Sequence, residues 1–391
     1  MIRSRNLLTV AAIVILITIV FYQSMTGSSD PSPSTDKTGP VKVLTHMDSL
    51  IIKYDSLLTA LIDSNETVGA AVVITHRGEI VHLKCYGVKR AGWNDPVDEN
   101  TIFRLASVSK PVTGVLAGIL DDEHIISLDD KVIEYLPGFT LKDSVNTFDL
   151  TVRHILSHTS GLVPHAYDNL VEAQIPFKTI IDSLSRVNIS SVPGRLYGYQ
   201  NVIFSLYDTI SEVRTGRKFE DLLKEKVFDP LGMVNASAGY QAFANHDNKA
   251  LPHSRKTTLP LNNKYYITNP AAGINASITD MGRFLLAVSS DGYGTLPAGI
   301  ADTVLSPQVL SPLRRVYLKK WNGVESKHYG LGWRIIGYKG YMIGYHGGYV
   351  QGFRAEIAVC REEELGIAFL TNSPGRVGSS AVPMLLDLYF Y

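Results

Sequence analysis

Two hydrophobic periodicities divide the chain into strand-like ends and a helical middle. Residues 69–75 are a run of small and β-branched residues, a polar turn follows at 76–79, and a second apolar run covers 80–88, which predicts a β-hairpin. Further strand-like runs lie at 341–344, 353–359 and 365–370, whereas helical spacing of apolar residues marks 41–61, 150–156, 177–184, 202–213, 219–228 and 278–288. The pattern predicts an α+β fold, an antiparallel sheet flanked by helices with a mostly helical insertion. We place the part with the sheet at 43–124 and 325–391, and the insertion at 125–324.

The first 42 residues do not fit this folded unit. Arg3 and Arg5 precede an uncharged apolar run at 7–22, which as a helix is about 24 Å long against the ~30 Å of a bilayer core. We expect residues 1–22 to be a signal anchor or a cleaved signal peptide, and residues 23–42, rich in Ser, Thr, Asp, Gly and Pro, to be a disordered linker. Both alternatives place the folded part outside the cytoplasm, either anchored to the cell membrane or secreted.

The charge balance argues against nucleic acid as a partner, and the two cysteines leave two alternatives open. Acidic and basic residues balance at 37 each, so no overall charge attracts nucleic acid, an anionic surface or acidic substrates. The sequence leaves the oligomeric state open. Cys85 and Cys360 fit either a disulfide of an exported protein or two buried thiols.

Residues 103–116 carry the strongest chemical signal. Pro111 lacks an N–H and fits a helix only in its first turn, so a helix begins close to Ser107 and Val108. Ser107 and Lys110 then lie one turn apart on the same face, with the hydroxyl at the positive end of the helix dipole. A lysine held among apolar neighbours loses its proton readily and can serve as a base. A serine three residues before a lysine also occurs by chance about once or twice in a chain of this length. The pair therefore indicates a catalytic site only together with further motifs.

Two later segments supply partners in a recognisable order. Tyr199 and Asn201 form a Tyr-x-Asn motif before a helical run, and His346 and Gly348 form a His-x-Gly motif at a strand end. With the Ser-x-x-Lys pair, they resemble the motifs of the serine β-lactamase-related superfamily, in the branch of class C β-lactamases, D-alanyl-D-alanine carboxypeptidases, D-aminopeptidases and carboxylesterases. The segments 156–162, 329–333 and 370–372 are also similar to that family, and the resemblance covers about residues 45 to 385.

The resemblance implies a β-lactamase/transpeptidase-like fold and a role for each motif residue. Ser107 is then the nucleophile that forms an acyl-enzyme, and Lys110 and Tyr199 share the role of base. The substrate contacts are Asn201, His346, Gly348 and Tyr349, and the backbone N–H groups of Ser107 and Tyr349 form an oxyanion hole. No cofactor and no metal are implied, and the pair His154 and His158 lacks the glutamate of a metalloprotease helix.

The resemblance implies a small molecule or a peptide as substrate. We favour hydrolysis of a D-amino-acid peptide or related amide. The alternatives are hydrolysis of an ester or a β-lactam by the same residues, and a non-hydrolysing penicillin sensor or pseudoenzyme. The third motif departs from the Lys-Thr-Gly of class C enzymes, because His346-Gly347-Gly348 has neither a permanent charge nor a hydroxyl. We therefore expect weak β-lactamase activity and better turnover of small esters or amides without a free carboxylate near the scissile bond. Arg354 is the residue best placed in sequence to replace the missing cation.

Overall fold

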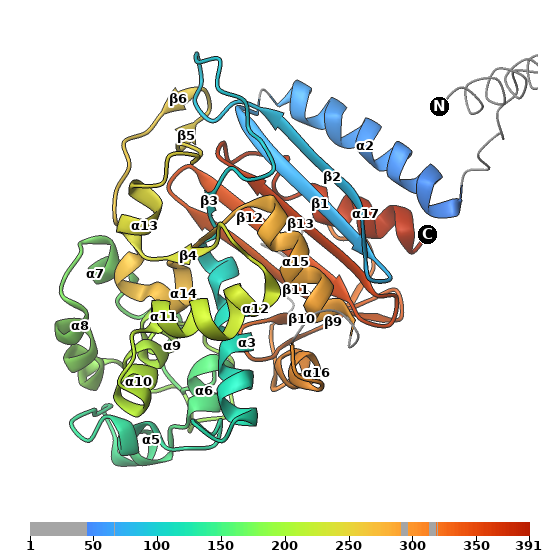
Figure 1. The fold of residues 1–391 in the computed structure, drawn as a ribbon. Coiled ribbons are helices and arrows are strands. Elements are labelled where there is room, and N and C mark those ends of the chain that lie inside the picture. The colour runs from blue at the N-terminus through green and yellow to red at the C-terminus, as the bar shows by residue number, and fades with distance from the viewer. Residues whose placement is uncertain (1–44, 66, 291–295, 313–317, 319) are drawn as a thin grey trace, which may run out of the picture. The chain divides into compact units, whose positions relative to one another are not determined.

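The two ends of the chain meet in one eight-stranded antiparallel sheet (Figure 1). The computed structural model describes residues 45–65, 67–290, 296–312, 318 and 320–391. The strand order is β2-β1-β13-β12-β11-β10-β9-β8. The strands are β1 (Gly69–His76), β2 (Glu79–Gly87), β8 (Val309–Leu310), β9 (Val324–Tyr329), β10 (Arg334–Tyr338), β11 (Tyr341–Val350), β12 (Phe353–Cys360) and β13 (Leu365–Thr371). The predicted α+β class and antiparallel sheet are confirmed.

Side chains of each strand alternate between two apolar cores. On β1, Ala70, Val72 and Ile74 join the core under α2 (His46–Ser64) and α17 (Ala381–Tyr389), while Ala71 and Val73 face the opposite core. The helix α15 (Ile278–Ser289) lies on that opposite face, where a Cβ added to Gly282 would come 3.0 Å from Val73. Figure 1 shows α2 and α17 on one side of the sheet and α15 on the other.

Residues 46–391 form one compact unit. The predicted division into 43–124 with 325–391, and 125–324, therefore stays a prediction, and α15 lies in the second range although it packs on the sheet. The remaining helices are α3 (Ser109–Asp122), α4 (Val132–Tyr135), α5 (Ser144–Asp149), α6 (Val152–Leu156), α7 (Asp168–Glu172), α8 (Phe177–Ser183), α9 (Asn201–Phe204), α10 (Leu206–Thr215), α11 (Phe219–Leu223), α12 (Asp229–Leu231), α13 (Tyr240–Ala244), α14 (Asn269–Ala272) and α16 (Ile300–Leu305). The short strands β3 (Phe103–Arg104), β7 (Ile274–Ala276) and β4 (Ser237–Ala238) form a second sheet, and β5 (His253–Ser254) pairs with β6 (Thr257–Thr258).

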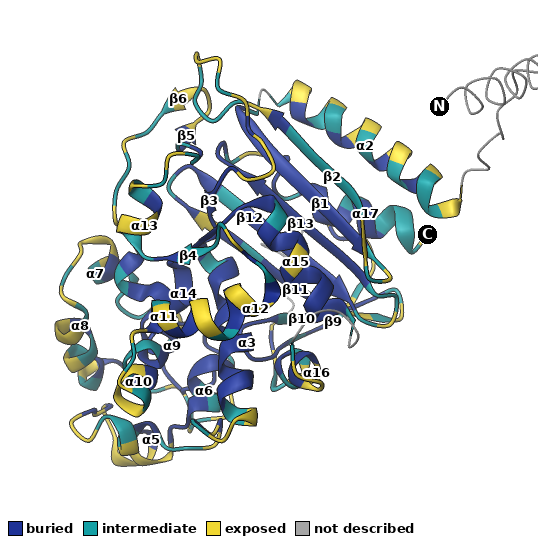
Figure 2. Cartoon of the chain, in the orientation of Figure 1, coloured by how far each residue is buried: buried dark blue, intermediate teal, exposed yellow. Residues whose placement is uncertain are grey.

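The helix α3 joins the sheet to the helical region and is buried on all sides from Ser109 to Leu120 (Figure 2). Glycines allow its backbone to touch the loop between β9 and β10. A Cβ on Gly114 would lie 2.1 Å from the carbonyl oxygen of Leu331, and one on Gly332, whose φ is +81°, would lie 2.2 Å from that of Lys110. Backbone contact at these glycines therefore fixes the start of α3 against the sheet.

Three segments differ from the sequence expectations. The predicted strand 341–344 continues to Val350 through Gly347 and Gly348, which strand propensity disfavours. The strands β9 and β10 were not predicted, because β9 reads Val-Glu-Ser-Lys-His-Tyr and lacks an apolar alternation. The predicted helix 202–213 is divided at Ser205 into α9 and α10.

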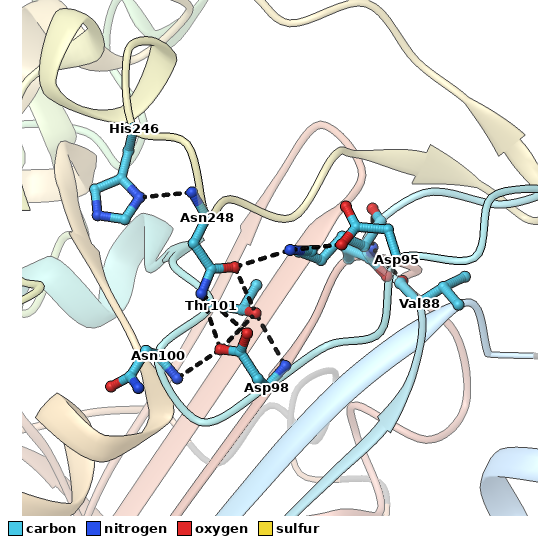
Figure 3. Close-up of polar contacts among 9 residues, drawn as sticks. Val88, Asp95, Asp98, Asn100, Thr101, His246 and Asn248 are labelled. Carbon is cyan, nitrogen blue, oxygen red and sulfur yellow. Dashed lines mark hydrogen bonds and ion pairs between the residues drawn. The ribbon is translucent and has the colours of Figure 1, made fainter.

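The loop that leads into β3 is held by a polar network around Asn248 (Figure 3). The Nδ2 atom of Asn248 donates to Asp98 Oδ1 at 2.9 Å, and its Oδ1 atom accepts from Lys89 Nζ at 3.1 Å and Thr101 Oγ1 at 3.0 Å. The next residue, Lys249, forms a β-bridge with Ile102. These contacts fix the chain a few residues before Ser107.

The two cysteines are free thiols. Cys85 lies on β2 and Cys360 on β12, with β1 and β13 between them. Three strand spacings of about 4.8 Å separate these strands by roughly 14 Å, twice the ~7 Å that a disulfide allows between Cα atoms. The disulfide alternative is therefore excluded.

The predicted N-terminal segment 1–22 and linker 23–42 lie outside the described residues. In the part of the chain that is described, every helix falls short of the length and apolar character that a membrane span requires.

Candidate active site

Ser107 lies in a one-turn 3₁₀ segment, Ala106–Val108, directly before α3. Ala106 has a φ of +48°, in the left-handed region that costs a non-glycine residue about 1–2 kcal/mol. Strained backbone of this kind is common where a side chain must be presented at a functional site. Ser107 is thereby set just before the first residue of α3, and it lines the pocket described below.

Lys110 is completely buried one turn after Ser107. Its Nζ atom lies 3.4 Å from Ser107 Oγ, 2.8 Å from Asn201 Oδ1 and 3.0 Å from the carbonyl oxygen of Ala271. Burial holds the pKa of Lys110 well below its usual value, and Arg334 lowers this pKa further, while Asp168 opposes the shift. The neutral amine is therefore favoured, and a neutral amine can accept a proton from Ser107.

Tyr199 is the second side chain in hydrogen-bond contact with the hydroxyl of Ser107. Its hydroxyl donates to Ser107 Oγ at 3.0 Å, and Lys110 Nζ lies 4.6 Å from the centre of its ring. Burial raises the pKa of Tyr199, so the phenol keeps its proton at neutral pH. Tyr199 is thus a proton donor in the resting site, and Lys110 is the group able to act as base.

Asn201, at the first position of α9, is held from two sides. Its Oδ1 atom accepts from Lys110, and its Nδ2 atom lies 3.1 Å and 3.0 Å from the two carboxylate oxygens of Asp168. Asp168 Oδ2 also accepts from His165 Nδ1 at 2.8 Å. A polar chain therefore runs from Lys110 through Asn201 and Asp168 to His165.

The strand β11 forms the opposite wall of the pocket. It pairs with β10 only as far as Tyr345, so residues 346–350 continue beyond the end of β10. A Cβ on Gly348 would lie 2.2 Å from the carbonyl oxygen of Leu105 and 2.9 Å from the backbone nitrogen of Ser107. Only a glycine permits this approach, which brings the β11 backbone beside Ser107 as an oxyanion hole requires. Tyr349 also lines the pocket, and its side chain is exposed.

The structure places His346 behind the pocket wall. The side chain is completely buried, its Nδ1 atom donates to the carbonyl oxygen of Gly347 at 3.0 Å, and its Nε2 atom lies 3.2 Å from Tyr329 Oη. Burial, with help from Arg334 and Lys110, holds the pKa of His346 well below its usual value. His346 is therefore neutral and supports Tyr329, and its direct contact with a substrate stays a prediction.

These residues surround a pocket of about 350 Å³. Its lining comes from both halves of the fold: Ser107, His165, Asp168, Tyr199, Asn201, Tyr265, Ala272, Arg334, Tyr345, Gly347, Gly348, Tyr349, Val350 and Arg354. Five of the seven residues predicted as site residues line it, and Lys110 and His346 lie directly behind it. Within the described ranges, no group of three His, Cys, Asp or Glu side chains is arranged to hold a metal ion.

Sequence reasoning missed several pocket residues. Arg334 follows the family-like segment 329–333 by one residue, so its position beside a known motif was a usable signal. Its Nη1 atom donates to Tyr197 Oη at 3.1 Å, and its guanidinium lies 5.2 Å from the ring centre of Tyr199. Asp168, the first residue of α7, and His165 in the turn before it lie in a segment without any recognised motif. His158 lies behind the pocket lining, with its ring centre 4.3 Å from that of Tyr199.

Residues 54–386 match the beta-lactamase family. The chain belongs to this family, within the superfamily of serine β-lactamases, penicillin-binding proteins and esterases. The fold is similar to that of an octameric penicillin-binding protein homologue from Pyrococcus abyssi, with a TM-score of 0.74, 22% sequence identity, and coverage of 86% of this chain and 77% of that chain.

Curated relatives are distant and functionally diverse. Penicillin-binding protein 4* of Bacillus subtilis (strain 168) is 24% identical over 76% of this chain and 66% of its own length. Beta-lactamase-like protein 2 of Dictyostelium discoideum is 24% identical over 90% of this chain and 65% of its own length. Esterase EstB of Burkholderia gladioli is 27% identical over 52% of this chain and 57% of its own length. The chain thus spans less than two thirds of each of these relatives.

Proposed function

We propose that this protein is an exported serine hydrolase that cleaves a D-amino-acid peptide through an acyl-enzyme on Ser107. One observation carries the proposal: Ser107 Oγ lies in the pocket within 3.4 Å of a buried lysine amine and 3.0 Å of a tyrosine hydroxyl. An activated nucleophile needs a base within hydrogen-bond reach, and a leaving group needs a proton donor. The preference for the D configuration rests on the resemblance to penicillin-binding proteins.

The contacts support the following proton transfers. Lys110 takes the proton of Ser107 as Oγ bonds to the substrate carbonyl carbon, and the backbone N–H groups of Ser107 and Tyr349 stabilise the oxyanion. The carbon–nitrogen bond then breaks as Tyr199 gives its proton to the leaving amine and recovers one from Lys110. A water molecule subsequently attacks the acyl-enzyme, with its proton returned to Ser107 by the same pair.

Two arginines favour a substrate with a free carboxylate. On β11, Tyr345 pairs with Arg334 of β10, and Tyr349 pairs with Arg354 of β12, so the two arginines flank Gly347 from neighbouring strands. Both line the pocket. Arg354 Nε donates to Glu356 Oε1 at 2.9 Å, so part of its charge is already compensated. Arg334 lies in the same pocket, with its guanidinium 5.2 Å from the ring centre of Tyr199, and it is our candidate for the cation that the third motif lacks.

This arrangement changes the substrate expected from the sequence alone. A neutral His346 and Gly347 led us to expect poor use of substrates that carry a carboxylate, but Arg334 places a positive charge in the same pocket. The positive charge supports the D-peptide, already the favoured substrate class from the sequence, in a form with a free C-terminal carboxylate. Hydrolysis of esters or β-lactams remains the second candidate, since esterases and β-lactamases are among the relatives. A non-hydrolysing sensor is the third.

Carboxylate recognition gives a direct test. A peptide that ends in D-alanyl-D-alanine is expected to have a kcat/KM about 10- to 150-fold above that of its C-terminal amide, the value of one charge-assisted hydrogen bond. The Arg334→Met variant should lose this discrimination, measured by release of D-alanine or D-alaninamide. Arg217→Met is the matched control, because Arg217 lies on the surface in an ion pair with Glu225. Equal rates for acid and amide with the wild-type enzyme, or a cephalosporin preferred by more than about tenfold, would contradict the proposed substrate.

We also propose that the catalytic part lies outside the cytoplasm, tethered by residues 7–22 and the linker 23–42. The proposal rests on the apolar run behind Arg3 and Arg5. Protease added to intact spheroplasts is expected to release a soluble fragment that still reacts with a fluorophosphonate probe. Resistance in intact spheroplasts together with cleavage in lysed ones would reverse the orientation.

A further inference from the structure

Asp168 is the first residue of α7, and the turn before it places its carboxylate at the back of the catalytic residues. His165 and Tyr167, which precede it, have φ values of +59° and +63°, a region that costs non-glycine residues about 1–2 kcal/mol each. The backbone N–H of His165 donates to the carbonyl oxygen of Tyr199 at 2.8 Å, and the His165 ring donates to Asp168. The strained loop is thus tied to the backbone of the catalytic tyrosine, with Asp168 directed at Asn201.

The amide of Asn201 has one orientation that satisfies both neighbours. Its oxygen accepts from Lys110 at 2.8 Å, and its nitrogen donates to Asp168 at 3.0 Å. A carboxylate only accepts hydrogen bonds, whereas a neutral amine both donates and accepts. Lys110 in its neutral form would therefore tolerate a flipped amide, but Asp168 would not, because two oxygens would then face each other.

The orientation matters for the reaction. If the amide were flipped, an N–H of Asn201 would donate to the lone pair of Lys110, which is the lone pair that must receive the proton of Ser107. With the observed orientation, the amide oxygen takes an N–H of Lys110 and leaves that lone pair for Ser107 Oγ, 3.4 Å away. The acceptor at position 168 therefore protects the base from a competing hydrogen bond.

We propose that Asp168 is a positioning residue of this site, which holds the Asn201 amide with its oxygen toward Lys110 and supplies a negative charge to the buried amine. The inference rests on the proposed function, in which Lys110 is the base. Asp168 does not touch the reacting atoms, and it acts through Asn201 and through its charge.

The effect of the Asp168 charge can be measured as a change in the pKa of Lys110, which several neighbouring groups set together. Burial is the main cause of its lowered pKa; Asp168 raises this pKa and Arg334 lowers it. The other titratable side chains that interact with Lys110 are the buried His158 and His346 and the phenol of Tyr199. Around Asp168 itself lie His165, Tyr199 and Tyr265. Removal of the Asp168 charge should therefore lower the pKa of Lys110 further.

Two variants separate charge from hydrogen bonding. Asp168→Asn removes the charge and keeps an oxygen that can accept from Asn201, while Asp168→Ala removes both. Asp229→Asn is the matched control, because it deletes one exposed carboxylate that pairs with Lys224 on the surface. The pKa of Lys110 is measured by NMR titration of lysine labelled with ¹³C at Cε, with its signal assigned by its absence in Lys110→Met.

The pKa of Lys110 is expected to fall by about one unit in both Asp168 variants and to stay at the wild-type value in Asp229→Asn. The acid limb of the acylation rate with a fluorophosphonate should move to lower pH by the same amount. Acylation at the plateau should fall by about 10- to 100-fold in Asp168→Ala and by less in Asp168→Asn, because misplaced catalytic groups cost rates of that order.

A purely structural role would lower the thermal midpoint of Asp168→Ala without moving the pKa of Lys110. An unchanged Lys110 pKa in both variants would overturn the inference. Absence of acylation in the wild-type protein would instead overturn the proposed function, and the NMR titration would still decide the role of Asp168.

Discussion

Replacement of Ser107 by alanine is expected to abolish both peptide hydrolysis and covalent labelling by a fluorophosphonate or a β-lactam. The hydroxyl is the atom that both Lys110 and Tyr199 contact, and without a nucleophile no acyl-enzyme forms. The loss of stability should be only about 1 kcal/mol, because Lys110 keeps its hydrogen bonds to Asn201 and to the backbone of Ala271. Intact-protein mass spectrometry with and without probe measures the labelling, and circular dichroism measures the fold.

Ser109→Ala is the matched control for this prediction. Ser109 is two residues away and completely buried, and its Oγ atom accepts from the backbone N–H of Ile274 at 3.0 Å. Its removal leaves a buried N–H without that acceptor, which should cost about 1–3 kcal/mol of the free energy of unfolding while labelling persists. An adduct that survives in Ser107→Ala and maps to Ser109 would show that the nucleophile is misassigned.

Tyr199→Phe is expected to lower kcat/KM by about 10²- to 10⁴-fold, the usual contribution of a positioned proton-transfer group. The phenyl ring still packs against His158, whose ring centre lies 4.3 Å away, so the thermal midpoint should change little. The variant lacks the hydroxyl that donates to Ser107, so the leaving group loses its positioned proton donor. Steady-state rates across neutral pH on one peptide substrate provide the measurement.

Tyr266→Phe serves as the comparison variant. It deletes a buried phenol hydroxyl that donates to Asn275 at 2.7 Å, and Tyr266 does not line the pocket. Its activity should stay near wild type after correction for the folded fraction. Near-normal turnover in Tyr199→Phe would show that Tyr199 only lines the pocket and transfers no proton. Lys110 would then be the remaining candidate for proton transfer.

The sequence by itself determined several of the elements and the order of the motifs. The β-branched run of β1 and the alternating cores on its two faces follow from a period of two, which local sequence encodes directly. Pro111 located the start of α3, because proline is tolerated only in the first helical turn. Ser107, Lys110, Tyr199 and Asn201 were found as motifs, and the structure brings them together within hydrogen-bond distance.

The tertiary structure alone decided which further side chains join them. Asp168 is 33 residues from Asn201 in sequence. Arg334, the first residue of β10, reaches the pocket because it pairs with Tyr345 of β11, a register that no local pattern encodes. The protonation state of Lys110 also depends on the tertiary structure, because burial among segments distant in the chain lowers its pKa. Local periodicity specifies helices and strands, but proximity and desolvation arise only when those elements pack, and these two effects set the chemistry of the site.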